Sequence, residues 1–217
     1  MAHPAEAPAT PPFWDEACRH LRRRDRVLKR LIPQFGEARL TGRGDAFTTL
    51  ARSVVGQQIS VKAAQSVWER FALLAGREAL AVDPQRVLGL QPQALRGAGL
   101  SMRKAEYVLD LARHFVEGRV HAGQWAGMDD EAIIRELVAI RGIGRWTAEM
   151  FLIFHLMRPD VLPLDDLGLI KGISLNYYSG EPVSRAEARE VAEAWAPYRS
   201  VATWYLWRSL DPVPVDY

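Results

Sequence analysis

The chain has 217 residues, of which 48% are hydrophobic and 25% charged, so it fits one large or two small soluble domains. The formal net charge of +2 by itself gives no reason to expect a polyanionic partner, and the single cysteine, Cys18, excludes an internal disulfide, a structural zinc site with several cysteines and a four-cysteine iron–sulfur cluster. No apolar run approaches the ~20 residues of a membrane span and the N-terminus has no signal-peptide core, so we expect an intracellular protein with no membrane partner.

Helical periodicity runs through nearly the whole sequence. Residues 1–13 are rich in alanine and proline and are predicted to form a disordered tail. From Trp14 to Leu31 apolar residues recur at helical spacing, and Cys18 falls on this apolar stripe, which favours a packed thiol. Further helices are predicted over residues 45–55, 60–71, 84–90, 92–95, 101–115, 129–138, 145–157, 165–170, 184–195 and 199–210. With no alternating strand and no fixed-period repeat, this pattern predicts an all-α protein.

The densest chemical signal is LVAIRGIGRWTAEMF, residues 137–151. It predicts a helix, a tight turn at Gly142 and Gly144, and a second helix. Together with the positive end of the second helix, the backbone amides of Gly142, Gly144 and Thr147 can bind a phosphate without any lysine. A dinucleotide-binding GxGxxG motif is poorly supported, because Thr147 replaces the third glycine and no strand precedes the turn. The alternative interpretation is a plain turn between two core helices.

Several motifs in this order resemble the helix-hairpin-helix DNA glycosylases, and most closely their AlkA-type 3-methyladenine branch. The motifs are VVGQQIS (54–60), GLSMRKAEYV (99–108), GIGRWTA (142–148), PLDDLGLIKG (163–172) and WAPYRSVATWYLW (195–207). The resemblance implies an all-α, two-lobed fold with the active-site cleft between the lobes. It places residues 14–44 and 159–217 in an N/C-terminal lobe with the catalytic aspartate, and residues 45–158 in a central lobe with the hairpin. Larger AlkA proteins carry an additional N-terminal β-containing domain, for which this chain has no room, so it looks like the compact form.

The resemblance implies a monofunctional DNA glycosylase that hydrolyses the N-glycosidic bond of alkylated bases, of the 3-methyladenine and 7-methylguanine type, by base flipping. This reaction starts base excision repair. Bifunctional relatives use a hairpin lysine as an amine nucleophile. Trp146 matches that position, and none of the four lysines lies in the hairpin, so no lyase activity is expected. The alternatives are a glycosylase for uracil, hypoxanthine or a mismatched base, and a non-catalytic helix-hairpin-helix DNA-binding protein.

The resemblance also implies roles for particular side chains. Asp166, the second aspartate of the motif, is the candidate catalytic carboxylate, which would stabilise the positive charge that develops on the sugar. Asp165 is assigned to capping the following helix, and the alternative is that both aspartates only cap. Gln58 matches the position of the wedge that fills the gap left by a flipped base. Trp146 and Trp207 match pocket-lining aromatic residues that would hold a cationic base, although aromatic spacing alone would place Trp207 in the core.

The remaining implications concern DNA and ions. Gly142, Gly144, Arg145 and Thr147 would form the phosphate-binding hairpin. Backbone carbonyls of Val138, Ile140 and Ile143 would coordinate Na⁺ or K⁺, and no other cofactor and no iron–sulfur cluster are expected. The expected partner is double-stranded DNA containing alkylated bases, bound by a monomer. In a bacterium, the protein would be cytoplasmic and associated with the nucleoid.

Overall fold

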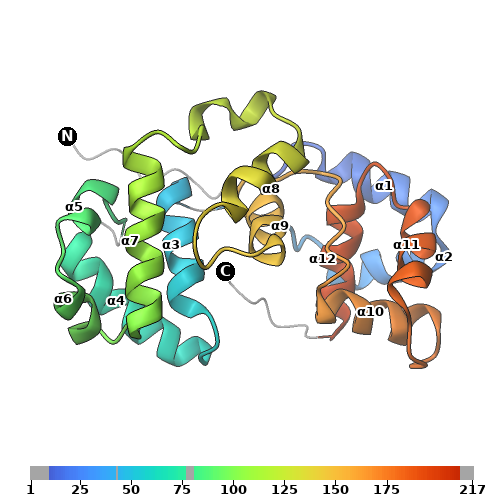
Figure 1. Cartoon of the computed structure of the whole chain (residues 1–217). Coiled ribbons are helices and arrows are strands. Elements are labelled where there is room, and N and C mark those ends of the chain that lie inside the picture. The colour runs from blue at the N-terminus through green and yellow to red at the C-terminus, as the bar shows by residue number, and fades with distance from the viewer. Residues whose placement is uncertain (1–9, 43, 77–80, 211–217) are drawn as a thin grey trace. The chain divides into compact units, whose positions relative to one another are not determined.

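The computed structural model describes residues 10–42, 44–76 and 81–210, and these form helices joined by short loops (Figure 1). The only β-type pairing among them is an isolated bridge between Gly76 and Val82, so the predicted all-α class is confirmed. None of the described helices has both the length and the apolar character needed to cross a membrane. Most of the predicted disordered tail, residues 1–9, lies outside the described residues, whereas Pro11 is buried and residues 12–13 turn into the first helix.

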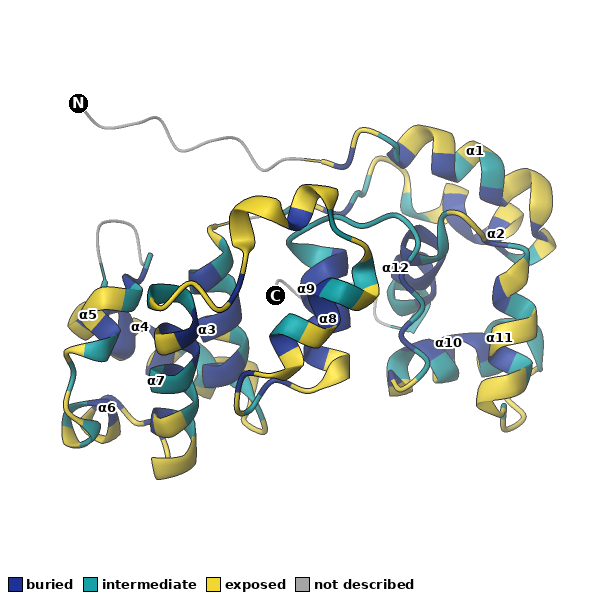
Figure 2. Ribbon diagram, turned by 45° about the horizontal axis from the view of Figure 1, so that its top comes forward, coloured by how far each residue is buried: buried dark blue, intermediate teal, exposed yellow. Residues whose placement is uncertain are grey.

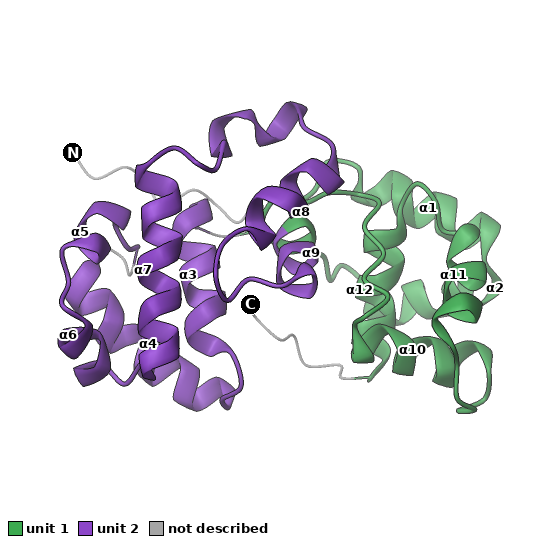
Figure 3. Cartoon of the chain, viewed as in Figure 1, with its two compact units in different colours: residues 1–42, 152–217 green, residues 43–151 purple. Residues whose placement is uncertain are grey.

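The helices follow one another as named in Figure 1. They are α1 (Trp14–Arg24), α2 (Arg26–Leu31), η1 (Ile32–Phe35, a 3-10 helix), α3 (Ala46–Gly56), α4 (Val61–Ala75), α5 (Pro84–Leu88), α6 (Pro92–Gly97), α7 (Met102–Val116), η3 (Ala122–Gly127, a 3-10 helix), α8 (Asp130–Val138), α9 (Arg145–Phe154), α10 (Leu167–Tyr177), α11 (Arg185–Glu193) and α12 (Arg199–Leu210). The chain divides into two compact units, shown in Figure 3. Unit 1 combines residues 1–42 with residues 152–217, and unit 2 comprises residues 43–151, so the second boundary falls inside α9.

Unit 1 is built on α12, which packs against α1, α2 and α10. Trp14 of α1 meets Trp204 of α12 edge to face, with ring centroids 5.1 Å apart. The Sγ of Cys18 lies 3.4 Å from the hydroxyl of Tyr205, and burial raises the pKa of this thiol. Cys18 is therefore a packed, protonated thiol, as its position on the apolar stripe predicts.

The helical run that begins at Trp14 is interrupted at Asp25, which apolar spacing did not reveal. Its backbone is extended (φ −133°, ψ 126°), and its Oδ1 caps α2 by accepting two backbone N–H groups, each at 2.8 Å. Its Oδ2 accepts hydrogen bonds from the hydroxyl of Tyr177 at 2.8 Å and from Nε1 of Trp195 at 3.1 Å. Asp25 thereby joins the N-terminal helices of unit 1 to its C-terminal part.

Unit 2 is organised around α7, which packs against α3, α5 and α6. The indole of Trp125 lies edge to face against Phe115 and Phe151, and its Nε1 donates to Glu136 at 2.9 Å. In both units the buried residues follow one side of each amphipathic helix, as the colouring in Figure 2 shows. This packing supports the loops that carry the candidate site.

Three predicted helix ends are wrong by three residues or more. Helix α4 runs to Ala75, not to residue 71. Helix α9 stops at Phe154, not at residue 157, because Met157 has a left-handed φ of +52° and the N–H of Arg158 bonds back to Leu152 O at 2.9 Å. Helix α10 runs to Tyr177, well beyond residue 170. Its Gly172 is a packing position rather than a stop, since a Cβ there would lie 3.0 Å from Leu206 Cβ of α12.

Candidate functional site

Asp166 is the N-cap residue of α10 and is 8% exposed. Its Oδ1 accepts two hydrogen bonds, from the Leu169 N–H at 2.6 Å and from Nε1 of Trp207 at 2.7 Å. The assignment of the cap to Asp165 is wrong, because α10 begins one residue later and gives the second aspartate the extended N-cap backbone. Asp165 is exposed and pairs with Arg185 at 2.7 Å. The cap and the predicted chemical role thus fall on the same carboxylate.

The two tryptophans of α12 have different surroundings. Trp204 is 9% exposed and belongs to the core beside Trp14. Trp207 is more exposed, donates to Asp166, and stacks on Phe154 with ring centroids 5.5 Å apart and planes 11° apart. The structure therefore brings Trp207 and Asp166 into direct contact. Sequence reasoning did not identify Phe154, which lies at the end of an otherwise apolar helix.

A glycine makes the approach of Trp207 to Asp166 feasible. A Cβ on Gly168 would lie 3.0 Å from Asp166 Oδ1 and 3.0 Å from Cδ1 of Trp207. Any larger residue would have to displace the indole or the carboxylate. The glycine two residues after the second aspartate of PLDDLGLIKG was the available sequence signal for this contact.

The turn between α8 and α9 has the predicted hairpin form, but its two glycines differ. Gly142 has φ +87°, and a Cβ there would lie 2.3 Å from the ring of Tyr107 in α7. Gly144 has no left-handed φ, and a Cβ there would meet nothing within 4 Å. Gly142 is therefore required by the turn, whereas the space beside Gly144 is open to a ligand. Of the two residues after Arg145, Trp146 is 36% exposed and Thr147 is buried.

Arg145, a predicted phosphate ligand, is engaged within the hairpin. Its guanidinium forms ion pairs with Glu131 of α8, through a short hydrogen bond, and with Glu149 of α9 at 3.0 Å. The hydrogen bond with Glu131 raises the pKa of Arg145 and is the largest cause that lowers the pKa of Glu131. Arg145 thus joins the two helices of the hairpin through its side chain.

The loop after α3 carries Gln58, which is exposed and has a left-handed φ of +57°. Its neighbour Gln57 donates from Nε2 to the carbonyl of Gly142 at 2.9 Å, so the loop is tied to the hairpin. Lys104 of α7 donates from Nζ to Val55 O at 2.7 Å, at the end of α3, and burial lowers the pKa of this amine. Sequence reasoning did not identify the partner of Gln57 or that of Lys104.

The predicted cation ligands lie where α8 ends and the turn begins. The carbonyl of Ile140 accepts the N–H of Ile143 at 3.2 Å, so one of the three predicted oxygens also closes the turn. Carbonyl oxygens near a helix C-terminus are suited to a hard cation. Among the described residues, no group of three or more His, Cys, Asp or Glu side chains is placed to bind a metal ion.

The predicted site residues are therefore distributed over both units. Asp166 and Trp207 belong to unit 1, and the hairpin, Trp146 and Gln58 belong to unit 2. A family model described as "HhH-GPD superfamily base excision DNA repair protein" matches residues 51–197. The chain belongs to this superfamily.

Relatives in the HhH-GPD superfamily share most of the chain. It is 31% identical to DNA-3-methyladenine glycosylase 1 of Schizosaccharomyces pombe, over 88% of this chain and 85% of that protein. It spans 59% of the length of two other relatives, YfjP of Bacillus subtilis and DNA-3-methyladenine glycosylase 2 of Escherichia coli, and is 34% identical to each.

Solved structures of this superfamily agree with the fold. A DNA-3-methyladenine glycosidase from Bacillus halodurans is 36% identical with a TM-score of 0.83, over 90% of this chain and 89% of that one. The Schizosaccharomyces pombe 3-methyladenine DNA glycosylase Mag1, solved in complex with abasic DNA, is 30% identical with a TM-score of 0.78, over 92% and 100% of the two chains.

Proposed function

We propose that this HhH-GPD protein is a monofunctional DNA glycosylase that hydrolyses the N-glycosidic bond of alkylated bases and so starts base excision repair. The observation that carries the proposal is the buried carboxylate of Asp166, fixed by Leu169 N–H and Trp207 Nε1. Cleavage of an N-glycosidic bond develops positive charge on the sugar, as in an oxocarbenium ion. A carboxylate already held in one orientation stabilises that charge without reorganising, and it can orient the attacking water.

The alkylated-base specificity rests on aromatic chemistry. N3- and N7-alkylated purines are cationic, and a cation over an indole face gains ~0.5–2 kcal/mol. We propose that Trp207, held parallel to Phe154, and the partly exposed Trp146 supply such faces to a flipped base. The names of the relatives, DNA-3-methyladenine glycosylases, support this substrate class. The complex of Mag1 with abasic DNA supports DNA as the partner of the fold.

Strand cleavage by a bifunctional glycosylase needs a lysine amine as nucleophile, and the positions of the lysines in this chain favour hydrolysis without strand cleavage. Trp146 stands where bifunctional relatives carry the hairpin lysine. The amine of Lys104 donates to the end of α3, so it is engaged in holding a helix. Lys171 is exposed in α10. We therefore propose that the product is an abasic site in an intact strand.

For DNA binding we propose the hairpin as the phosphate site and Gln58 as the wedge. The open space at Gly144 allows a phosphate to approach the backbone amides at the start of α9. A hairpin-bound Na⁺ or K⁺, held by the carbonyls of Val138, Ile140 and Ile143, would add positive charge beside that phosphate. Its test is a titration of abasic-DNA affinity with KCl, NaCl and tetramethylammonium chloride at equal ionic strength. Equal affinity in all three would contradict the cation proposal.

The decisive experiment compares Asp166→Asn with Asp165→Asn on duplex DNA methylated at purines. An asparagine at position 166 still offers an oxygen to Leu169 and Trp207, so the cap survives and only the charge is lost. We expect single-turnover excision by Asp166→Asn to fall by roughly 100–1,000-fold while DNA affinity is kept. The exposed, Arg185-paired Asp165 is the matched control and should retain its rate. Full activity of Asp166→Asn would refute the assignment.

The same assay separates the alternative functions. Free base with strand breaks only after alkali indicates monofunctional excision, and breaks without alkali indicate lyase activity. Binding without either product indicates a non-catalytic module. A panel of duplexes containing uracil, hypoxanthine or a mismatch tests the other lesions. We further propose a monomer, tested by sedimentation, and in a bacterial cell a cytoplasmic, nucleoid-associated location, tested by imaging a fluorescent fusion.

A further inference from the structure

A dense group of cations surrounds the point where α1 gives way to α2. Residues 19–30 contain seven of the 28 basic side chains and only one of the 26 acidic ones, which leaves 21 basic against 25 acidic in the rest of the chain. The segment thus carries a formal charge of +6 inside a protein whose total is +2. The small net charge hides a strongly asymmetric distribution.

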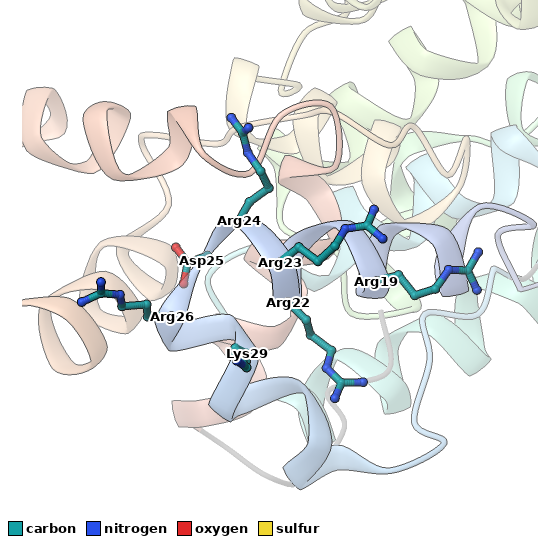
Figure 4. A pocket seen from close by; sticks show the side chains of 7 residues that line it. All are labelled: Arg19, Arg22, Arg23, Arg24, Asp25, Arg26 and Lys29. Atoms are coloured by element: carbon teal, nitrogen blue, oxygen red, sulfur yellow. The ribbon is translucent and has the colours of Figure 1, made fainter.

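Six of these cations line one hollow on unit 1, with a volume of about 640 Å³. Because the chain turns at Asp25, side chains from the C-terminal half of α1 and from α2 point in several directions around this bend, as Figure 4 shows. The cationic lining, named here the basic hollow, consists of Arg19, Arg22, Arg23, Arg24, Arg26 and Lys29. All six side chains are exposed.

The basic hollow holds six cations against a single lining carboxylate, that of Asp25. Within the described part of the chain, none of its six cations takes part in an ion pair. Asp25 also lines it, but this carboxylate is 8% exposed, and its two oxygens are occupied by the α2 backbone, Tyr177 and Trp195. Counter-charge must therefore come from solvent ions or from a bound anion.

Helix stability does not account for this arrangement. Arginines at positions 22–24 complement the C-terminal end of the α1 dipole, but Arg26 opens α2, where the helix dipole disfavours a cation. Arg19 and Arg23 also lie one turn apart on α1, and like charges at that spacing destabilise a helix. Arg26 and the Arg19–Arg23 pair thus destabilise the helices that carry them, and a bound anion would offset their charge.

The lining identifies the class of that anion. Every residue around the hollow is charged, whereas a protein partner's interface core requires apolar and aromatic groups. Five of the six cations are arginines, whose planar guanidinium pairs with phosphate through two parallel hydrogen bonds. An array of such groups with no apolar side chain contacts a phosphate backbone without reading bases.

We propose that the basic hollow is an auxiliary binding surface for the phosphate backbone of duplex DNA, separate from the hairpin. The proposal rests on DNA being the substrate, and it assigns this surface to sequence-independent binding. Such binding is dominated by the release of counterions from neutralised phosphates. It gives a protein with little net charge the affinity needed to remain on undamaged DNA while it searches.

The test uses the full chain and a short, fluorescently labelled, undamaged duplex. The variant Arg22→Gln/Arg23→Gln/Arg26→Gln removes three charges from the basic hollow. The matched control Arg96→Gln/Arg119→Gln/Arg189→Gln removes three charges from exposed arginines on other elements. Affinity is measured by anisotropy over a range of KCl concentrations, which gives the slope of log K against log salt concentration.

Each lost phosphate contact lowers the magnitude of that slope by about 0.9. For the triple variant of the basic hollow, called the hollow variant, we therefore expect a slope smaller in magnitude by about 2.7 and binding at least about tenfold weaker at low salt. The control should change much less. Equal slopes for the hollow variant and the wild type, or equal losses in the two variants, would overturn the proposal.

A second readout separates this proposal from the proposed function. Single-turnover excision of alkylated bases at saturating enzyme should be the same in the wild type and the hollow variant, because the chemistry lies elsewhere. Absence of excision in the wild type would refute the glycosylase proposal and leave the binding slopes valid. A lower saturated rate in the hollow variant alone would contradict a purely auxiliary role.

Discussion

The two glycines of the hairpin allow a sharp test of the local geometry, through Gly142→Ala. The new Cβ would lie 2.3 Å and 2.4 Å from two ring carbons of Tyr107, about 1 Å inside ordinary contact, which begins at 3.4 Å. A non-glycine residue in the left-handed region costs ~1–2 kcal/mol. Overpacking against the ring of Tyr107 costs ~1–3 kcal/mol. The free energy of unfolding should therefore fall by about 2–5 kcal/mol, or roughly 5–15 °C in melting temperature.

The matched control is Gly144→Ala, whose Cβ meets nothing within 4 Å at an ordinary φ. Its stability in urea should stay within about 0.5 kcal/mol of the wild type. Its affinity for abasic duplex should fall, because the added methyl occupies the space through which a phosphate reaches the backbone. In a Tyr107→Ala background the overpacking part of the Gly142→Ala loss should disappear and the backbone part should remain. Equal stability of the two alanine variants would refute this account of the turn.

Three further predictions follow from contacts of the site. Trp207→Phe keeps an aromatic ring but removes the N–H that donates to Asp166. The single-turnover rate of excision at saturating enzyme should fall about 10–100-fold while DNA affinity is unchanged. An unchanged rate would show that the indole N–H does not position the carboxylate. Gln57→Leu removes the hydrogen bond to the Gly142 carbonyl and should lower the free energy of unfolding, measured in urea, by ~1 kcal/mol. An unchanged free energy of unfolding would contradict this prediction. The hydrogen bond from Arg145 lowers the pKa of the Glu131 carboxyl below its ordinary value of 4.5, so the folded state binds fewer protons than the unfolded state. The stabilisation is therefore fully present above about pH 4.5. It is lost as the pH falls through the lower pKa of the folded state. Urea titrations at several pH values should show that the free energy of unfolding falls more on acidification in the wild type than in Glu131→Gln. The difference should be less than ~1 kcal/mol because the ion pair is exposed. Parallel pH dependences of the two proteins would contradict this prediction.

The sequence predicts most of the fold because the helix caps are local. Ser60 and Ser101 each accept the backbone N–H of the residue three positions on, and Ser184 forms a full capping box with Glu187. These signals need only three or four consecutive residues, so periodicity and capping place the helices with small errors at their ends.

The errors occur where distant residues decide. Asp25 breaks a helical run because Tyr177 and Trp195, more than 150 residues away, complete its hydrogen bonds. Helix α10 continues past residue 170 through Gly172, where Leu206 of another helix fills the space that a side chain would take. Neither partner is visible in a local window, so neither outcome follows from propensity.

The candidate site divides in the same way. Its glycines were predictable because a tight hairpin needs them, whereas the roles of Asp166, Trp207 and Gln58 were predicted only from the resemblance of short motifs to a known family. The hydrogen bond between Trp207 and Asp166, its dependence on Gly168 and the link from Gln57 to the hairpin were not, because each joins segments that only the tertiary fold brings together.

The discontinuous composition of unit 1 has a consequence for the order of events during synthesis. Unit 2 is one continuous stretch, residues 43–151, and its contacts are complete as soon as that stretch has left the ribosome. Helices α1 and α2 are made before unit 2, yet their partner α12 and the donors to Asp25 are made after it. The two N-terminal helices must therefore wait, with their apolar stripe uncovered and their arginines already exposed, until α12 has been synthesised.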